Sequence, residues 1–239
     1  MKFPESNSPL LAEFVGILLG DGQIRNSLVG ITTNGVDDKE YIAYLLNIIK
    51  NLFDFSAKIK TRKNDRAVDI QMHGKSITNY FLSLGMIKSP KWKRAEIPQQ
   101  FRNGRFGKFV LRGYFDTDGC VTFYKRTDRH NQTTYARLEM KFSPAPMQKQ
   151  FTELLKLYNI NFCEYPIYNE NRGRTLVRVN GVSEIRKWMS IIGTNNPKHY
   201  RKIKSIAGVG VPSNHARRDS FLNLRPFNLR QDFSYPNGL

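Results

Sequence analysis

Two aspartates, Asp21 and Asp118, are the residues of this sequence best placed to do chemistry, and each is followed by a glycine. Each ends a mostly apolar segment, FVGILLGDG at 14–22 and LRGYFDTDG at 111–119, and they lie 97 residues apart (118 − 21). Carboxylates brought together at helix ends repel each other and the negative ends of the helix dipoles. A divalent cation relieves that repulsion, and Mg²⁺ held by carboxylates and phosphate is a common means of cutting phosphodiesters.

Small residues spaced four apart indicate how the two acids come together. Gly16 and Gly20 in the first segment match Gly113 and Thr117 in the second. On helices these residues form narrow faces that allow close backbone contact, as in small-residue pairs of membrane helices. We therefore expect the two helices to pack side by side and to bring their terminal acids together.

The glycines that follow the acids, Gly22 and Gly119, are expected to occupy left-handed positions that end the helices. A single Asp-Gly pair is also a common turn sequence without any function. Two such pairs at matching places in a duplicated chain favour a site over two ordinary turns.

The elements that must position these acids occur twice in the same order. After each apolar segment the sequence predicts two strands, an amphipathic helix (37–53 or 145–158), a hairpin (58–73 or 164–180) and a short helix. Each half therefore reads αββαββα, which predicts an α+β fold. The expected domains are a first repeat at 1–100, a linker at 101–107, a second repeat at 108–207 and a C-terminal extension at 208–239.

The chain has 239 residues, and 38 Lys+Arg against 20 Asp+Glu give a net charge of +18. This charge favours nucleic acid as the partner, since basic side chains on phosphates release counterions. The sequence has no apolar run long enough to span a membrane and no signal peptide at its start, so an intracellular protein is expected. Two cysteines, Cys120 and Cys163, are too few for a disulfide framework, and we expect both to be buried.

The paired motifs, the repeat order and a Pro-Lys in each half (Pro90-Lys91 and Pro197-Lys198) resemble the LAGLIDADG homing endonucleases in their single-chain, two-motif form. The resemblance covers about residues 10–205. It implies two αββαββα pseudo-repeats related by a pseudo-twofold axis, with two antiparallel saddle-shaped sheets forming a DNA-binding surface. It further implies a monomeric, site-specific double-strand DNA endonuclease of intron homing that recognises a long asymmetric site and uses Mg²⁺, with Mn²⁺ or Ca²⁺ able to occupy the metal site.

Carried onto this sequence, the resemblance makes Asp21 and Asp118 the catalytic, metal-binding acids. Gly20 and Thr117, which directly precede them, are included among the metal ligands. An earlier acid of the motif is absent from the first copy, where Leu19 stands. Its counterpart in the second copy is Asp116, a position that serves the helix interface more than the metal.

Basic residues near the cut are a further feature that the resemblance implies. By repeat position these are Lys198 and Lys91, although Lys88 and Lys93 are close enough in sequence to compete. Some relatives carry a Gln after the first motif, where this chain has Thr-Thr-Asn at 32–34, so the surroundings of the metal are expected to differ.

One face of every strand is expected to meet DNA. Arg can read guanine and Asn or Gln can read adenine, whereas Lys more often holds the backbone. The expected DNA-binding residues are Arg25, Asn26, Lys58, Lys60, Arg62, Gln71, Lys125, Arg137, Lys141, Arg174, Arg178 and Asn180.

Other functions fit the sequence less well. An RNA-splicing maturase, with intron RNA as partner, or a DNA-binding regulator on the same scaffold is the alternative. Glu139 and Lys141 form the E-x-K of another nuclease class with Asp128 upstream, but such short matches are frequent by chance. The four histidines lack the spacing of a zinc site, and no Walker or Rossmann glycine pattern occurs.

Overall fold

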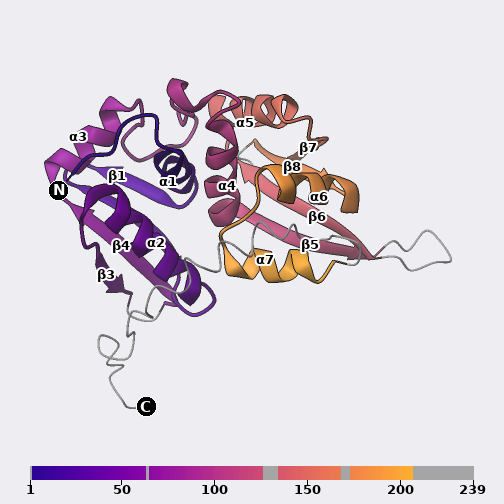
Figure 1. The fold of residues 1–239 in the computed structure, drawn as a ribbon, viewed down its shortest axis with the longest axis horizontal. Helices are drawn as coiled ribbons and strands as arrows, with labels where there is room; N and C mark the ends of the chain where they lie inside the picture. The colour runs from indigo at the N-terminus through magenta and orange to yellow at the C-terminus, as the bar shows by residue number, and fades with distance from the viewer. Residues whose placement is uncertain (1, 63–64, 126–133, 168–172, 207–239) are drawn as a thin grey trace, which may run out of the picture.

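The computed structural model describes residues 2–62, 65–125, 134–167 and 173–206, and the predicted order of elements occurs twice within them (Figure 1). The first half contains α1 (Pro9–Leu19), β1 (Gly22–Arg25), β2 (Leu28–Asn34), α2 (Lys39–Phe53), β3 (Lys58–Thr61), β4 (Ala67–His73) and α3 (Lys75–Ser83). The second half contains α4 (Gly107–Asp118), β5 (Gly119–Lys125), β6 (Thr134–Phe142), α5 (Pro146–Leu157), β7 (Cys163–Ile167), β8 (Arg174–Asn180) and α6 (Val182–Ile191).

Two further helices lie outside the repeat: η1 (Gln99–Phe101) precedes α4, and α7 (Pro197–Lys204) follows α6. Each half therefore has the predicted αββαββα order, and α7 is an addition in the second half. The predicted C-terminal extension, 208–239, lies outside the described residues.

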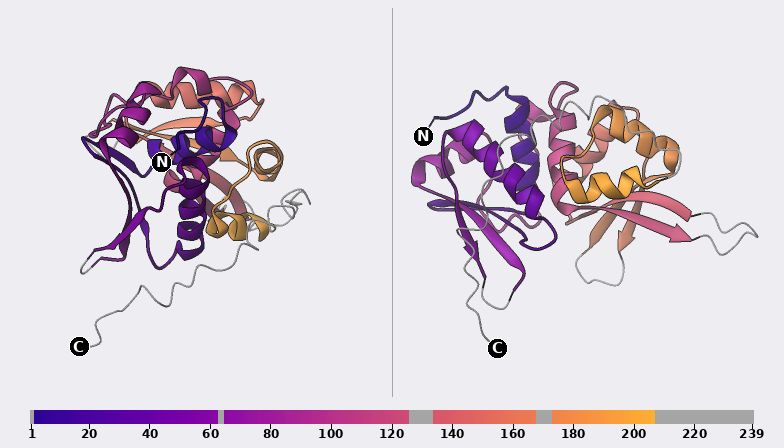
Figure 2. Two further views of the ribbon diagram at one scale, coloured as in Figure 1. Left: turned by 60° about the vertical axis from the view of Figure 1, so that its left-hand side comes forward. Right: turned by 60° about the horizontal axis from the view of Figure 1, so that its bottom comes forward.

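Each half forms one antiparallel sheet of four strands, in the orders β1-β2-β4-β3 and β5-β6-β8-β7. Strand β4 shows why one face is covered, because Val68, Ile70 and Met72 are at most 4% exposed and alternate with more polar residues. The helices lie against these apolar faces, and the two sheets splay apart below the paired helices (Figure 2). The fold leaves the polar face of each sheet open, as predicted.

Helices α1 and α4 pack along the predicted seam at the centre of the molecule (Figure 1). A Cβ added to Gly16 would collide with the carbonyl oxygen of Val110, and one added to Gly113 would collide with that of Glu13. Gly20 lies in the same way against the side chain of Thr117. The small residues therefore permit backbone contact, and the predicted packing is confirmed.

The predicted left-handed conformation of Gly22 and Gly119 is wrong. Gly119 has a φ of −89° and an extended conformation, and Gly22 is already the first residue of β1. The chain runs directly from α4 into β5, and only Gly20 and Asp21 separate α1 from β1, so no left-handed residue is needed at either glycine. Glycine is required there by space instead, because a Cβ on Gly119 would collide with the Phe115 ring and a Cβ on Gly22 with the backbone of Leu18.

A buried polar cluster fastens the two halves beside the seam. Glu13 of α1 forms an ion pair with Arg112 of α4, and both side chains are almost fully buried. Tyr44 of α2 donates its hydroxyl to the same carboxylate at 2.6 Å, and Asn195 also donates to it. Burial raises the pKa of Glu13, but Arg112 and these hydrogen bonds outweigh burial and hold it below its usual value.

Both cysteines are exposed, so the expectation that they are buried is wrong. The strand register explains the error, because Cys120 pairs with Glu139 and Cys163 pairs with Arg178 on the open face of the second sheet. Within the described residues, no helix combines the length and apolar character needed to cross a membrane.

Candidate active site and nucleic-acid interface

The two motif acids meet where α1 and α4 run into their sheets. Asp21 follows the end of α1, Asp118 is the last residue of α4, and a Cβ on Gly20 would lie 3.5 Å from Asp118 Oδ2. Crowding by protein atoms and then the charge of Asp118 raise the pKa of Asp21 to about 7. Burial likewise raises the pKa of Asp118. Asp21 is nevertheless partly exposed and Asp118 exposed, so both carboxylates are accessible to a ligand.

Lys91 places an ammonium group between these acids and the end of α1. Its Nζ donates to the carbonyl oxygens of Leu18, Leu19 and Gly20 at 2.8, 2.7 and 2.6 Å. These carbonyls have no partner within the helix, because the last turn of a helix leaves its acceptors free. Burial lowers the pKa of Lys91 to about 8, against the opposing effect of both acids.

Lys198 lies on the Asp21 side of the site. It is held from the start of α7, where the side chain of Asn196 accepts the Lys198 amide at 3.0 Å. Its Nζ forms an ion pair of 2.7 Å with Asp38, and its charge lowers the pKa of Asp21. The competing Lys88 is exposed and donates to Asn26 Oδ1 at 3.0 Å, and Lys93 is also exposed.

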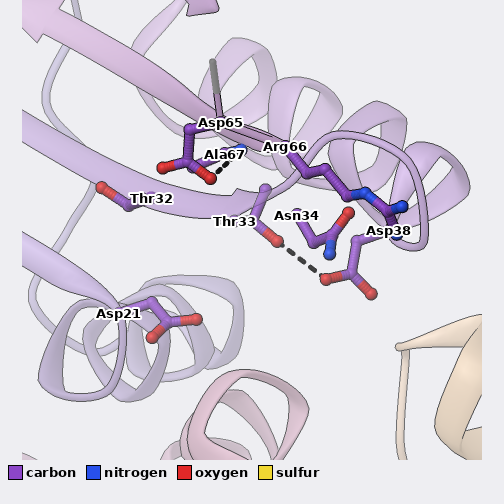
Figure 3. Close-up of a pocket in the computed structure, with 8 residues that line it drawn as sticks. All are labelled: Asp21, Thr32, Thr33, Asn34, Asp38, Asp65, Arg66 and Ala67. Carbon is purple, nitrogen blue, oxygen red and sulfur yellow. Dashed lines mark hydrogen bonds between the residues drawn. The ribbon is translucent and has the colours of Figure 1, made fainter. Parts of the chain in front are cut away.

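A pocket of about 340 Å³ opens beside Asp21 (Figure 3). The end of β2 forms one wall, since the amide of Thr32 donates to the carbonyl oxygen of Asp21 at 3.3 Å. This is the Thr-Thr-Asn segment that stands where some relatives carry Gln. The lining residues are Asp21, Thr32, Thr33, Asn34, Asp38, Asp65, Arg66 and Ala67.

Asp38 is the residue of this site that sequence reasoning missed. Its position before α2 resembles that of an ordinary helix cap, and its partner Lys198 lies 160 positions away in the sequence. No spacing rule connects two residues that far apart in different halves. The only available signal was an acid at the start of a helix, which is typical of many proteins.

The oxygen atoms available at the acids suit a divalent cation. Among the described residues, no group of three or more His, Cys, Asp or Glu side chains could hold a metal. Two carboxylates completed by water and phosphate oxygens are, however, a usual coordination for Mg²⁺. The raised pKa values of Asp21 and Asp118 reflect a place that disfavours uncompensated negative charge, which a cation would stabilise.

The two further metal ligands suggested by the sequence are differently placed. The Gly20 carbonyl oxygen already accepts from Lys91. The Thr117 hydroxyl donates within its own helix, with acceptors in Gly113 and Tyr114 at 3.1 and 3.0 Å. Both groups are therefore already engaged in hydrogen bonds within the protein.

Asp116, the earlier acid of the second motif, is buried and organises the chain before α7. Its carboxylate accepts from the Thr194 hydroxyl and, at 2.8 Å, from the Asn195 amide, and its carbonyl oxygen accepts from the Asn196 side chain at 2.9 Å. Burial raises its pKa to about 7. Its contacts are with residues 194–196, in keeping with a packing role.

The open face of the first sheet carries most of its predicted DNA-binding residues. Gln71 pairs with Lys58 and Gly30, and Lys60 pairs with Asp69, so these positions share one face. Arg62 is held by two hydrogen bonds to Asp69, of 3.0 and 2.7 Å. On this face or in its β1–β2 turn lie Arg25, Asn26, Lys58, Lys60, Arg62 and Gln71.

The second sheet brings its predicted residues together with aromatic rings. Arg137 lies over Tyr124, with 4.6 Å from its guanidinium carbon to the ring centre, and Arg178 lies over Tyr165 at 4.8 Å. Arg178 also forms an ion pair of 2.6 Å with Glu139. Because the Glu139 carboxylate is already paired with this arginine, the structure does not favour the E-x-K alternative. The register places Arg137, Lys141, Arg174, Arg178 and Asn180 on the open face.

Lys125 does not share these register positions. It pairs with Thr134 at the end of β5 and takes the same place in the strand alternation as Val121 and Phe123, opposite to Cys120 and Thr122. Its side chain lies outside the described part of the structure, as does Asp128.

Three solved structures illustrate the likeness to known proteins. The homing endonuclease I-WcaI bound to its DNA recognition sequence is 13% identical with a TM-score of 0.58, over 85% of this chain and 88% of that one. Meganuclease I-SmaMI bound to uncleavable DNA is 11% identical with a TM-score of 0.56, over 90% and 97%. I-DmoI in complex with DNA and Mn is 15% identical with a TM-score of 0.53, over 79% and 98%.

Sequence comparison finds short matching stretches in long proteins, and no protein-family model matches the chain. The replication factor C small subunit of Methanocaldococcus jannaschii is 27% identical over 199 residues, and a DNA polymerase of the same organism is 25% identical over 187 residues. These stretches cover 82% and 71% of this chain but 10% of each relative. Because the two relatives carry different names and the match is a tenth of each, neither name transfers an activity.

The fold is therefore the one seen in these three homing endonucleases. Its two pseudo-repeats and two four-stranded antiparallel sheets are those of the LAGLIDADG fold in its single-chain form.

Proposed function

We propose that this chain is a LAGLIDADG homing endonuclease, a monomer that cuts both strands of a long asymmetric DNA site with the help of a divalent metal ion. The observation that carries the proposal is the meeting of Asp21 and Asp118 where the paired helices run into two sheets with basic open faces. Carboxylates gathered in this way, within reach of phosphate-binding surfaces, suit phosphodiester hydrolysis.

DNA binding is the part of the proposal that the sheet faces support. A two-stranded ribbon fits the major groove, where Arg reads guanine and amide side chains read adenine. Lysines on the same faces suit the phosphate backbone. With a net charge of +18, the protein is expected to lose affinity steeply as salt rises, and a shallow slope would mean that few of these charges meet phosphate.

Asp21 and Asp118 are the residues that would hold Mg²⁺, and Mn²⁺ or Ca²⁺ are expected to occupy the same place. When bound, the metal supplies positive charge that stabilises the attacking and leaving oxygens of the phosphodiester. Each acid comes from one half of the molecule, so each is expected to serve one DNA strand. Lys91 contributes a cation next to both acids and balances part of their charge.

The alternative is an RNA-splicing maturase or a DNA-binding regulator on the same scaffold. A protein that only binds gains nothing from two clustered acids whose raised pKa values reflect a cost in stability. This alternative predicts intron RNA binding, splicing rescue or gene regulation that survives the loss of both acids.

Plasmid cleavage tests the proposal. The full chain is incubated with Mg²⁺ and a plasmid library of candidate sites, including the rejoined flanks of the genomic locus that carries this reading frame. We expect linear product from the wild type, nicked circles from Asp21→Asn or Asp118→Asn, and no cleavage from the double variant or in EDTA. Asp54→Asn is the matched control, because Asp54 is an exposed acid that forms an ion pair with Lys50.

Two outcomes would overturn the proposal. One is intact DNA across the whole library with a protein that is folded and binds DNA. The other is a double Asp21→Asn, Asp118→Asn variant that still cuts at the rate of Asp54→Asn.

A further inference from the structure

Asp38 is a buried acid beside the candidate active site with an unusual set of partners. It precedes α2 in the position where an aspartate normally accepts hydrogen bonds from the first helical amides. No such bond is present. Instead, Oδ2 accepts from the Thr33 hydroxyl at 3.0 Å and Oδ1 from Lys198 Nζ at 2.7 Å.

The side chains of this ion pair differ in exposure, at 9% for Asp38 and 38% for Lys198. A carboxylate buried to this extent needs a partner, since an unpaired buried charge is strongly destabilising. A lysine with this exposure would otherwise sample many rotamers. The pair therefore both neutralises the buried carboxylate and restricts the lysine to one place.

The acid that fixes Lys198 lines a pocket in the other half. Asp38 lines the same pocket as Asp21, and both carboxylates come from the first half of the chain (Figure 3). Lys198 comes from α7 of the second half, and its charge acts on Asp21. The ion pair therefore holds the ammonium group of a lysine from the second half near the acid of the first half.

We propose that Asp38 is a positioning residue that holds the Lys198 ammonium group beside Asp21, so that Lys198 acts on the DNA strand served by Asp21. This role rests on the endonuclease function proposed above. It assigns the lysine of the second half to the acid of the first.

A second ion pair between the same two helices provides a matched control. Arg201 of α7 contacts Glu40 of α2 at 3.1 and 2.9 Å, and both side chains are exposed. Glu40→Gln therefore removes an acid that joins α2 to α7 without changing the pocket of Asp21. Loss of helix docking alone would affect this control and Asp38→Asn alike.

Strand-specific single-turnover cleavage of a target labelled on each strand tests the assignment. We expect Asp38→Asn to slow cutting of one strand, the same strand that Asp21→Asn affects, and the loss should be about 100-fold, as misplacement of a reacting group can cause. Cutting of the other strand and DNA affinity should stay near wild type. Lys198→Met should have the same effect, and adding Asp38→Asn to it should slow cutting no further, because the two residues act as one unit. Asp38→Glu, which keeps the charge, should cut faster than Asp38→Asn, and Glu40→Gln should match wild type.

The outcomes separate the two proposals. A wild type that cuts no target overturns the endonuclease function itself. A wild type that cuts, with Asp38→Asn indistinguishable from Glu40→Gln, overturns the positioning role alone, as do multiplicative effects of Asp38→Asn and Lys198→Met. Should Asp38→Asn fail to fold, Lys198→Met decides, since slowing of the Asp118 strand or of neither strand contradicts the assignment.

Discussion

The Pro-Lys segments of the two halves occupy corresponding places in the repeat but have different structures. Pro197-Lys198 begins α7, because the Asn196 side chain accepts the amide of Lys198. Pro90-Lys91 belongs to a loop without helix, and the Ser89 hydroxyl instead accepts the amide of Ile24 at 3.2 Å. One lysine is therefore presented by a helix and the other by a loop packed against β1.

The difference leads back to one motif position. Asp116 in the second motif fixes the Thr194 hydroxyl and the Asn195 amide, and so prepares the start of α7. Leu19 stands at the same motif position in the first half, and its buried apolar side chain offers no hydrogen-bond acceptor. Duplicated sequences can therefore keep the two motif acids in place while a single substitution changes how each lysine is held.

Under the proposed function, this asymmetry would bear on the cutting of two non-equivalent DNA strands. Lys91 is close enough to interact with both acids. Lys198 belongs to the second half of the chain and acts on Asp21 of the first half. Burial raises the pKa of Asp118, and the positive charge of Arg174 offsets part of this rise. The two strands would thus meet different cations at the same pair of acids.

Exchanging the motif residue should have the largest effect on the comparison. Asp116→Leu, which makes the second motif resemble the first, should lower the free energy of unfolding by about 3 kcal/mol. It leaves the Thr194 hydroxyl and the Asn195 amide without acceptors, and buried unsatisfied groups cost about 1–3 kcal/mol each. Urea unfolding measures the change. A loss below about 1 kcal/mol would show that Asp116 does not hold the start of α7.

Removal of each lysine should separate their roles. Lys91→Met should slow cutting of both strands about 100-fold, because it removes a cation next to both acids and frees three carbonyl groups at the end of α1. Lys198→Met should slow one strand alone. Single-turnover assays on a doubly labelled target read both rates. Equal losses on both strands for Lys198→Met would remove the functional difference between the two segments.

The residues before the two prolines offer a smaller contrast in stability. Asn196→Ala should lower the free energy of unfolding by about 1–2 kcal/mol, as loss of a helix cap does. It also removes the bond from the Asn196 side chain to the Asp116 carbonyl oxygen. Ser89→Ala removes one bond in a loop, and about 0.5 kcal/mol is expected. Chemical denaturation of both variants tests this, and equal losses would show that the Asn196 cap has no special weight.

Sequence reasoning was strongest where a repeating pattern and a local rule coincide. The repeat order and the core face of β4 follow from hydrophobic periodicity, and the close approach of Gly16 and Gly113 follows from residue size. Gly85 and Gly193, which follow α3 and α6, have φ angles of 94° and 73°, as glycines just after a helix commonly do. These features depend on residues that are near in sequence or repeated in a recognisable way.

Sequence reasoning failed where an outcome depends on contacts between distant segments. The pairing of Asp38 with Lys198 joins two halves that no local pattern connects. The exposure of Cys120 and Cys163 depends on strand register, which single-residue preferences do not determine. Ser89 and Asn196 both precede a proline, and only the tertiary contacts of each decide which one caps a helix.

The pH dependence of stability should distinguish the two acids, with the smallest expected effect. The folded, metal-free protein holds the proton of Asp21 up to a pKa of about 7, whereas the unfolded chain releases it near 3.8. Between these values the folded state binds more protons, so stability falls as pH rises through this window. Asp21→Asn removes the effect and should make the protein in EDTA more stable than wild type at pH 8. We expect a gain of about 1 kcal/mol, because solvent screens this partly exposed carboxylate, and a smaller gain at pH 5.

For Asp118→Asn the gain should be smaller, since Lys91, Tyr114 and Arg174 already offset the burial of Asp118. Urea unfolding at both pH values decides, and a gain at pH 5 that equals or exceeds the gain at pH 8 would contradict the raised pKa of Asp21.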